Sequence, residues 1–278
     1  MSKNLTILFV GDVVGEPGRR AVSKLLPEAR AQYKADFCVV NGENAAGGAG
    51  ITPKTFAELR AAGADVVTTG DHVWDNKEVM AMMGNEPRLL RAANYPSRAA
   101  GLGSVVVEST TGLKIAVLNL MGRTFMKNLD CPFHVAEQEV ARLRQETSVI
   151  FVDMHAETTS EKIAIARFLD GQVSAVIGTH THVQTADEQI FPQGTAFLCD
   201  AGMTGPHESV LGREIQPVIQ RFITQMPQKF EVAQRDIRLN GAVAQIDYET
   251  GHAVSIQRIS IRLDPAESGV KANAFAFI

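Results

Sequence analysis

Residues 5–12 read LTILFVGD, an apolar run that ends in a glycine and an aspartate. The pattern returns at 36–44, DFCVVNGEN, and at 66–72, VVTTGDH. Short runs rich in valine, isoleucine and phenylalanine, bounded by turn residues, are typical of buried strands. Helical patterns fill the intervals at 17–34 and 53–63. Strands that alternate with helices in this way predict βαβ units and an α/β fold.

The alternation continues through the middle of the chain. The expected elements are two strands joined by a Thr-Gly turn, then a helix, a strand, a helix and two strands, at 104–109, 113–120, 136–145, 148–155, 159–171, 173–180 and 195–200. The tail, about 229–263, predicts antiparallel hairpins that close the fold. No internal repeat or linker-like segment is present, so we expect a single domain over residues 1–278.

The composition is that of a globular protein. Hydrophobic residues make up 45% and charged residues 21% of the 278 positions, which excludes a largely disordered chain. Charged or histidine residues interrupt every apolar run before it reaches the roughly 18 residues needed to cross a bilayer. The start of the chain has neither the length nor the cleavage site of a secretion signal. We therefore expect a protein that is neither secreted nor membrane-spanning.

The cysteines indicate the cellular compartment of the protein, and the net charge limits the classes of partner that it can bind. Cys38, Cys131 and Cys199 are odd in number and far apart, which favours neither a disulfide framework nor a thiolate zinc site. Three isolated thiols fit a reducing cytoplasm. The net charge of −4 lacks the basic excess of proteins that bind nucleic acid strongly and generally, so any nucleotide recognition must be local.

Acidic and histidine residues follow the ends of the expected strands. In chain order they are Asp12, Glu43, Asp71, His155, His180 and His182. In open α/β sheets, ligands bind outside the carboxyl ends of the strands, so residues far apart in sequence can share one crevice. We expect these six side chains to meet there.

Each of these residues has a plainer interpretation when it is taken alone. Asp12 could be a helix cap or turn residue, and Glu43 a loop carboxylate. His180 and His182, two positions apart on an extended segment, point to the same side and could reach one metal, or they could be a pair on the surface. A single dinuclear metal centre explains the whole ordered set, whereas the plainer interpretation has to be invoked separately at every strand end.

The glycines near the first strand suggest a different function, dinucleotide binding. Gly11, Gly15 and Gly18 are spaced G-x-x-x-G-x-x-G, however, and the dinucleotide fingerprint is G-x-G-x-x-G. Asp12 would also place an uncompensated anion beside a pyrophosphate, whereas a metal ion between the two turns repulsion into attraction. The segment therefore favours a metal site.

Six motifs occur in a fixed order along the chain: GDVVG (11–15), NGEN (41–44), GDHVWD (70–75), HAETTSEK (155–162), GTHTHVQTAD (178–187) and DAGMTGP (200–206). Together they resemble the signature of the YmdB-type calcineurin-like metallophosphoesterases, and the match covers nearly the whole chain. The resemblance implies an αββα sandwich with mixed central sheets, two metal ions and phosphodiesterase activity on cyclic nucleotides.

The resemblance also implies a role for each matching residue. Asp12 and His182 would bind one metal, Glu43 would bridge to the second, and Asp71, His155 and His180 would complete that second site. His72 would be the general acid, and Asn44 would help to hold the ligand or phosphate, unless it is a structural loop amide. Arg123 is a further candidate for a phosphate contact because of its paired donors, although a surface ion pair is an open alternative.

Asp71 departs from the pattern of the family, in which the motif usually reads Gly-Asn-His. Aspartate still supplies a hard oxygen ligand. It lacks the amide N–H donor, however, and adds a negative charge beside the phosphate site. The substitution bears on both metal affinity and activity.

Three imidazoles and three carboxylates form a mixed nitrogen and oxygen ligand set, which suits Mn, Fe or Zn better than Mg or Ca. The resemblance favours iron or manganese. Such metals lower the pKa of a bound water and produce hydroxide for in-line attack on phosphorus. We therefore predict a phosphodiesterase whose partner is a small phosphodiester or nucleotide.

Two other functions use the same residues. One is a phosphomonoesterase or nucleotidase, because the shared chemistry does not show whether a second ester group is accommodated. The other is a regulatory protein that binds a nucleotide through the metals and turns it over slowly. A homo-oligomer is compatible with the sequence but cannot be derived from it.

Overall fold

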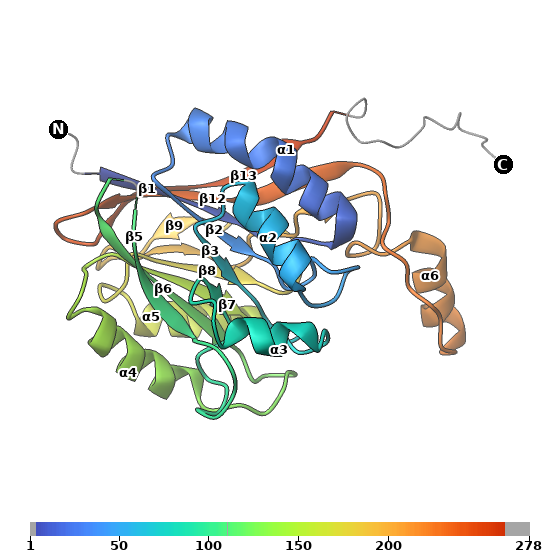
Figure 1. Ribbon diagram of the computed structural model, residues 1–278, viewed down its shortest axis with the longest axis horizontal. Coiled ribbons are helices and arrows are strands. Elements are labelled where there is room, and N and C mark those ends of the chain that lie inside the picture. The colour runs from blue at the N-terminus through green and yellow to red at the C-terminus, as the bar shows by residue number, and fades with distance from the viewer. Residues whose placement is uncertain (1–3, 110, 265–278) are drawn as a thin grey trace.

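A computed structural model describes residues 4–109 and 111–264 of the chain. Two mixed β-sheets pack face to face, and helices cover the outer face of each sheet (Figure 1). The predicted αββα sandwich is therefore confirmed. The arrangement follows from the strands, whose two faces are both apolar and must both be covered.

The first sheet has the strand order β11-β12-β1-β2-β3-β4, with β13 paired to β12. Strands β1 to β4 run parallel to one another, whereas β12 runs antiparallel to β1 and joins β13 in a long hairpin. The bounds are β1 Asn4–Val10, β2 Phe37–Asn41, β3 Val66–Thr68, β4 Leu89–Leu90, β11 Gly205–Pro206, β12 Ile237–Asp247 and β13 Ala253–Arg262.

The second sheet has the order β5-β6-β7-β8-β10-β9. Its four central strands are parallel, and β5 and β9 pair antiparallel at its two edges. The bounds are β5 Ser104–Glu108, β6 Lys114–Met121, β7 Ile150–His155, β8 Ala175–Thr179, β9 Gln189–Ile190 and β10 Ala196–Leu198.

Four helices complete the outer layers. The helices α1 (Gly15–Tyr33) and α2 (Pro53–Ala61) cover the first sheet, and α4 (Pro132–Leu143) and α5 (Thr159–Phe168) cover the second (Figure 1). A short helix, α3, spans Glu78–Met83, and α6, Ile215–Thr224, projects from the side of the molecule.

Side-chain alternation along β1 explains why one apolar run serves two cores. Ile7 and Phe9 pack between the sheets, whereas Leu8 and Val10 pack against the helices α1 and α2. Successive side chains on a strand point to opposite faces, so a strand covered on both sides must be apolar at every position. Phe9 meets Phe151 of β7 with ring centroids 5.1 Å apart, a contact that joins the two sheets.

The C-terminal hairpin begins later than the sequence pattern indicates. Residues 229–236 form no strand, and Val232 makes only an isolated bridge with Arg213. A strand needs a neighbouring strand for its backbone hydrogen bonds, and this segment has none beyond that bridge. The helices α3 and α6 and the two-residue strands β4, β9 and β11 had not been predicted.

Candidate metal centre

The predicted ligands follow parallel strands in both sheets. Asp12 follows β1, Glu43 follows β2 and Asp71 follows β3, whereas His155 ends β7 and His180 directly follows β8. The carboxyl ends of these strands meet at one edge of the sandwich, as expected for an α/β ligand site. Ligand atoms of four of these residues lie within 4.8 Å of one another: Glu43, Asp71, His155 and His180.

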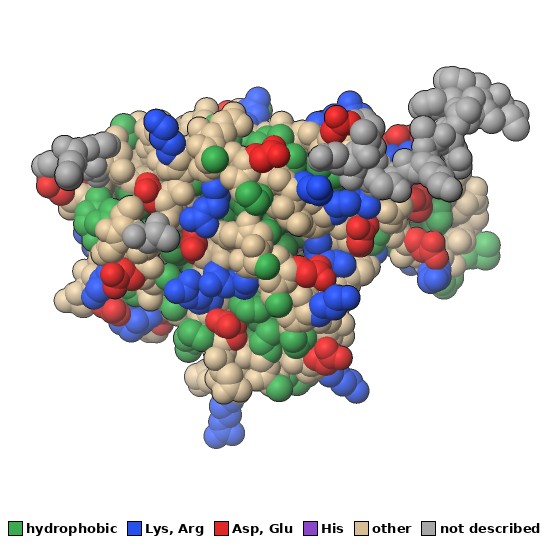
Figure 2. All heavy atoms as spheres, turned by 45° about the horizontal axis from the view of Figure 1, so that its top comes forward, with side chains coloured by type: hydrophobic (Ala, Val, Ile, Leu, Met, Phe, Trp, Pro, Cys, Tyr) green, Lys and Arg blue, Asp and Glu red, His purple; other side chains and the backbone are tan. Residues whose placement is uncertain are grey.

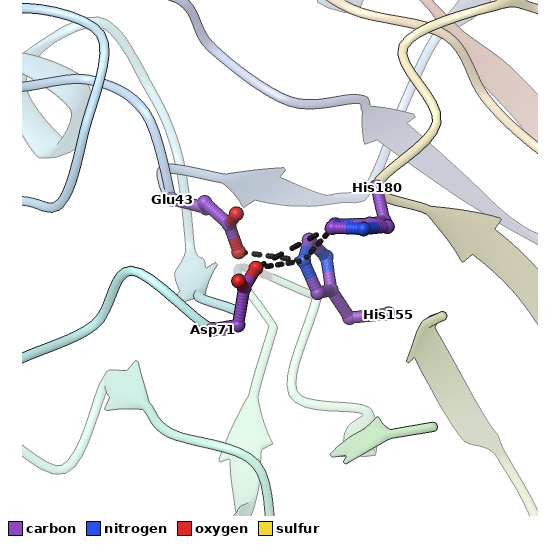
Figure 3. A group of neighbouring side chains, drawn as sticks. All are labelled: Glu43, Asp71, His155 and His180. Carbon is purple, nitrogen blue, oxygen red and sulfur yellow. Dashed lines mark hydrogen bonds and ion pairs between the residues drawn. The ribbon is translucent and has the colours of Figure 1, made fainter. Parts of the chain in front are cut away.

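These four side chains point toward one another (Figure 3). His155 Nε2 lies 2.7 Å from Glu43 Oε2, 3.3 Å from Asp71 Oδ1 and 3.1 Å from His180 Nδ1. His180 Nδ1 lies 3.5 Å from the same Asp71 oxygen. Glu43 and His155 are buried, while Asp71 and His180 are partly exposed. The cluster is therefore open to a ligand on one side only.

The charges in the cluster are strongly coupled. Burial alone would lower the pKa of His155, but the Glu43 carboxylate and a hydrogen bond with Asp71 raise it well above its usual value. Burial is the largest single influence on Asp71 and acts to raise its pKa, yet the hydrogen bond and charge of His155, together with Glu43 and His72, outweigh it, so the pKa is lowered. Burial, and next the charge of His155, lower the pKa of His180 to about 3. Without a metal, the proton therefore stays on His155 and His180 is neutral.

Buried polar residues behind the cluster fix the tautomer of His155. Thr179 Oγ1 donates to Asp153 Oδ1 at 2.7 Å, so its lone pairs are left to accept from His155 Nδ1 at 2.9 Å. Asn41 and Thr68 donate to the other oxygen of Asp153. This arrangement holds the His155 proton on Nδ1 and turns Nε2 toward the cluster, as in a metal-ligating imidazole.

Asp12 lies against the same group. Its Oδ2 accepts from the His180 backbone N–H at 3.1 Å, and its Oδ1 lies 3.8 Å from His155 Nδ1. Asp12 Oδ1 is buried, and none of the described residues donates a hydrogen bond to it. A buried carboxylate oxygen without a partner is costly, and a cation would satisfy it. With carboxylate and imidazole donors converging on one point, these residues fit a metal ion.

His182 stands apart from the four-residue group. Its Nε2 lies 3.0 Å from Asn44 Oδ1, and its Nδ1 lies 3.2 Å from the Leu211 carbonyl oxygen. Both His182 and Asn44 line a cavity of about 340 Å³ that also exposes Glu43 and His180. The predicted roles of His182 as a metal ligand and of Asn44 as a residue that helps to hold the ligand or phosphate stay predictions.

A buried ion pair holds the loop that carries the two histidines. His180 and His182 have positive φ angles of 98° and 65°, a conformation that side chains other than glycine rarely adopt. Between them, the Thr181 N–H and hydroxyl donate to Asp200 Oδ2 at 3.1 and 2.6 Å. The same oxygen lies 2.7 Å from Lys162 Nζ, and both charged side chains are buried. The ion pair therefore fixes the strained loop.

His72 also lines the cavity. Its Nδ1 lies 2.8 Å from Asp75 Oδ2, which orients the ring, and no hydrogen bond from the described residues engages Nε2. His72 therefore lines the cavity without being a member of the four-residue group, and its role as general acid stays a prediction.

The predicted phosphate contact Arg123 lies outside the cluster, whereas another arginine, Arg213, lines the cavity. Arg123 is exposed, its backbone N–H donates to Glu161, and no described contact joins its side chain to the cluster. Arg213, which sequence reasoning missed, lines the cavity. No motif or residue spacing in the sequence identifies Arg213. It reaches the cavity only in the folded chain, where it contacts Gly48, which is far away in sequence.

Comparison with known proteins places this site in a family. A family model described as YmdB-like protein matches residues 8–259. The chain belongs to the YmdB-like family. This relationship confirms the predicted family, and the four clustered residues lie in the sequence motifs of this chain from which that family was predicted.

Individual YmdB-like relatives match over nearly their full length. The chain is 47% identical over 260 residues to a 2′,3′-cyclic-nucleotide 2′-phosphodiesterase of Bacillus subtilis, covering 94% of this chain and 98% of the relative. A solved structure of a hypothetical protein from Thermus thermophilus has a TM-score of 0.86 and 40% identity, over 93% of this chain and 99% of that one. A novel phosphatase from Mycoplasma pneumoniae has a TM-score of 0.88 and 34% identity, over 96% and 97%.

Proposed function

We propose that this YmdB-like chain is a cytoplasmic, metal-dependent phosphodiesterase that hydrolyses 2′,3′-cyclic nucleotides. The observation that carries the proposal is the convergence of carboxylates and imidazoles beside a cavity that His72 also lines. The Bacillus subtilis relative is named for this activity, and the resemblance of the sequence motifs had already implied a phosphodiesterase. A cyclic nucleotide is small enough to reach such a cavity from one side.

The six strand-end residues would hold two metal ions, with iron or manganese favoured and zinc as the alternative. They are Asp12, Glu43, Asp71, His155, His180 and His182. The ions would supply the Lewis acidity for in-line attack of water on phosphorus. The fixed tautomer of His155 presents Nε2 as a ligand, and Asp200 holds the loop of His180 and His182 in place.

His72 acts on the leaving group. As the P–O2′ bond breaks, the ribose oxygen takes a proton from His72, whose ring Asp75 orients. Asn44, bonded to His182, faces the same cavity and contributes a polar contact to the phosphate. Products are an opened 3′-phosphomonoester with a free 2′-hydroxyl.

The first test compares diesters with monoesters on protein reconstituted with Mn²⁺ or Fe²⁺. We expect multiple turnovers of 2′,3′-cyclic AMP and far slower release of phosphate from AMP. Preferential hydrolysis of monoesters would instead support a phosphomonoesterase, a function favoured by the similarity to the Mycoplasma pneumoniae protein, which is described as a phosphatase. A single turnover or none, with metal bound, would support the regulatory nucleotide-binding protein and refute the enzyme.

A second test isolates His72. His72→Ala should slow hydrolysis of 2′,3′-cyclic AMP by about 10²–10⁴-fold, the usual contribution of a general acid. The loss should be much smaller for a p-nitrophenyl diester, because its leaving group needs little protonation. His134→Ala is the matched control, since His134 is exposed on α4. Equal losses for both substrates, or loss of bound metal, would contradict the role.

The surface agrees with a small-molecule partner. On the face shown in Figure 2, basic and acidic side chains are interspersed, so this face presents no continuous basic field for nucleic acid. Among the helices described, none has both the length and the apolarity to cross a bilayer. Self-association into a homo-oligomer is also part of the proposal, and light scattering tests it.

A further inference from the structure

Arg213 is a cation without a counter-ion on the wall of the cavity. It is half-buried, and its Nη2 donates to the carbonyl oxygen of Gly48. None of the described carboxylates forms an ion pair with Arg213. Burial lowers the pKa of Arg213, and no acidic neighbour offsets this effect. A partly desolvated cation of this kind gains stability from an anion that enters the cavity.

Two other partly buried arginines of the chain are paired. Arg19 contacts Glu58, and Arg30 lies 3.1 Å from Asp65. Both of these arginines lie on α1, away from the cavity that Arg213 lines. Arg60 and Arg91 also form no ion pair with a described carboxylate, but neither lines this cavity, so Arg213 is singled out by its place where a phosphate ester would enter.

The loop beneath Arg213 is shaped around it. Gly48 has a φ of +90°, and a Cβ at this position would lie 2.5 Å from Arg213 Nη1 and 2.9 Å from Cζ. Only glycine satisfies both the conformation and the close approach. The guanidinium therefore rests on the backbone of residue 48, a contact that any larger side chain would displace.

Hydrogen bonds tie Arg213 to the residues of the metal centre. The Gly48 carbonyl oxygen, which accepts from Arg213, also accepts from Asn44 Nδ2 at 3.4 Å. Asn44 Oδ1 contacts His182, whose Nδ1 meets the carbonyl oxygen of Leu211, two residues before Arg213. The guanidinium is therefore held in a fixed relation to the proposed ligands and is a built part of the cavity.

We propose that Arg213 binds a non-bridging phosphoryl oxygen of the substrate and supplies much of the affinity of the site for anionic phosphodiesters. A guanidinium has five N–H donors, so those not used by Gly48 remain for the ligand. The proposal rests on the proposed function for its substrate. It also explains how a site with an extra carboxylate at Asp71 attracts an anion, because Arg213 offsets part of that charge.

The test distinguishes the effect of the positive charge of Arg213 from the effect of its hydrogen bond to the loop at Gly48. Arg213→Gln keeps an N–H donor for the Gly48 carbonyl and removes the cation. With metal-loaded enzyme, we expect KM for 2′,3′-cyclic AMP to rise about tenfold or more, the range for loss of a charge-assisted hydrogen bond, with a smaller change in kcat. The dissociation constant of inorganic phosphate, measured by calorimetry, should rise by a similar factor. Arg221→Gln is the control, because Arg221 is exposed on α6 and bonds only the Gln225 carbonyl.

The outcomes distinguish this inference from the proposed function. If the wild type hydrolyses no diester, the proposed function fails, and phosphate binding still decides the role of Arg213. An Arg213→Gln variant that binds phosphate and substrate as tightly as the wild type overturns the inference. If Arg213 had only a structural role, Arg213→Gln would lower Tm and metal content, but the folded, metal-loaded fraction of the variant would bind phosphate as tightly as the wild type.

If Arg213→Gln does not fold, Arg213→Lys replaces it. Lysine retains the charge but lacks the paired donors, so phosphate affinity should fall severalfold. Unchanged affinity in that variant would overturn the inference.

Discussion

Asp71 adds a third carboxylate beside Asp12 and Glu43, where the motif that this segment resembles would have an asparagine. Its Oδ1 contacts both His155 and His180. We predict that Asp71→Asn binds the second metal more weakly but turns over faster when metal is saturating, because the lost charge attracts metal and repels phosphate. Titration of Mn²⁺ into metal-free protein, followed by kcat at the plateau, tests this prediction. Unchanged or slower turnover by the fully metallated variant would show that Asp71 does not restrain activity.

The proton on His155 makes metal binding depend on pH. Its pKa is raised in the folded protein, so the proton on His155 stabilises the metal-free fold below the usual histidine pKa, although burial also raises the pKa of the neighbouring Glu43 to about 7. That stability is lost as pH rises through the raised pKa. A metal must displace the Nε2 proton, so we predict that metal affinity rises with pH and that binding releases about one proton.

Calorimetric titration in two buffers with different ionisation heats measures this proton release. The prediction is that His155 releases its Nε2 proton when metal binds. It would be contradicted if the binding heats in the two buffers were identical after correction for metal–buffer binding and the affinity did not change between about pH 6 and 8.

The site residues differ in how far sequence predicts them. Asp12, Glu43 and His155 follow strands whose apolar runs are plain in the sequence, and the rule that ligands gather at strand ends brings them together. Arg123 was selected by residue type alone and lies exposed outside the cluster. Arg213 could not be predicted from the sequence, because its place in the cavity and its contact with Gly48 arise only when two distant loops come together in the fold.

At the scale of elements, the Lys162–Asp200 ion pair joins α5 to the segment after β10, and Asp200 in turn holds Thr181 in the loop after β8. Asp200→Asn would leave a buried lysine without its charge partner. We predict a loss of about 3–5 kcal/mol in the free energy of unfolding and weaker metal binding, because Thr181 loses its anchor. Urea denaturation and metal titration measure the two effects.

The matched variant for that experiment is Lys162→Met combined with Asp200→Asn. Removal of both charges should recover a large part of the stability, because no uncompensated charge remains buried. If the double variant is as unstable as the sum of the single variants, the charges do not interact and the interpretation is wrong.

Elements that bury an apolar face were the predictable ones. The strands β1, β2 and β7 stand out as continuous apolar runs because both of their faces are buried, and the helix α1 stands out by its helical period of apolar residues. By contrast, α6 exposes Phe222 and Ile223, so its apolar residues do not mark a core face. Segment 229–236 alternates like a strand but lacks a neighbouring strand to pair with.

At the scale of the whole molecule, both sheets share one core. Phe9 and Val39 of the first sheet pack with Phe151 and Ile177 of the second. We predict that the chain unfolds as one unit, as the single-domain prediction requires, because neither sheet can keep its inner face buried alone. Circular dichroism and the fluorescence of Trp74, the only tryptophan, should report the same urea midpoint. Separated midpoints would show two domains.

The antiparallel pairing of β1 with β12 has a consequence for biosynthesis. Asn4 pairs opposite Asp247, so β1 leaves the ribosome long before β12, the strand that pairs with one of its edges. While translation proceeds, β1 can pair with β2 along one edge only, and its other edge stays open to foreign strands. The nascent polypeptide therefore exposes the unpaired edge of β1 until β12 has been synthesised. Chaperone binding during this time would protect that edge from pairing with other chains.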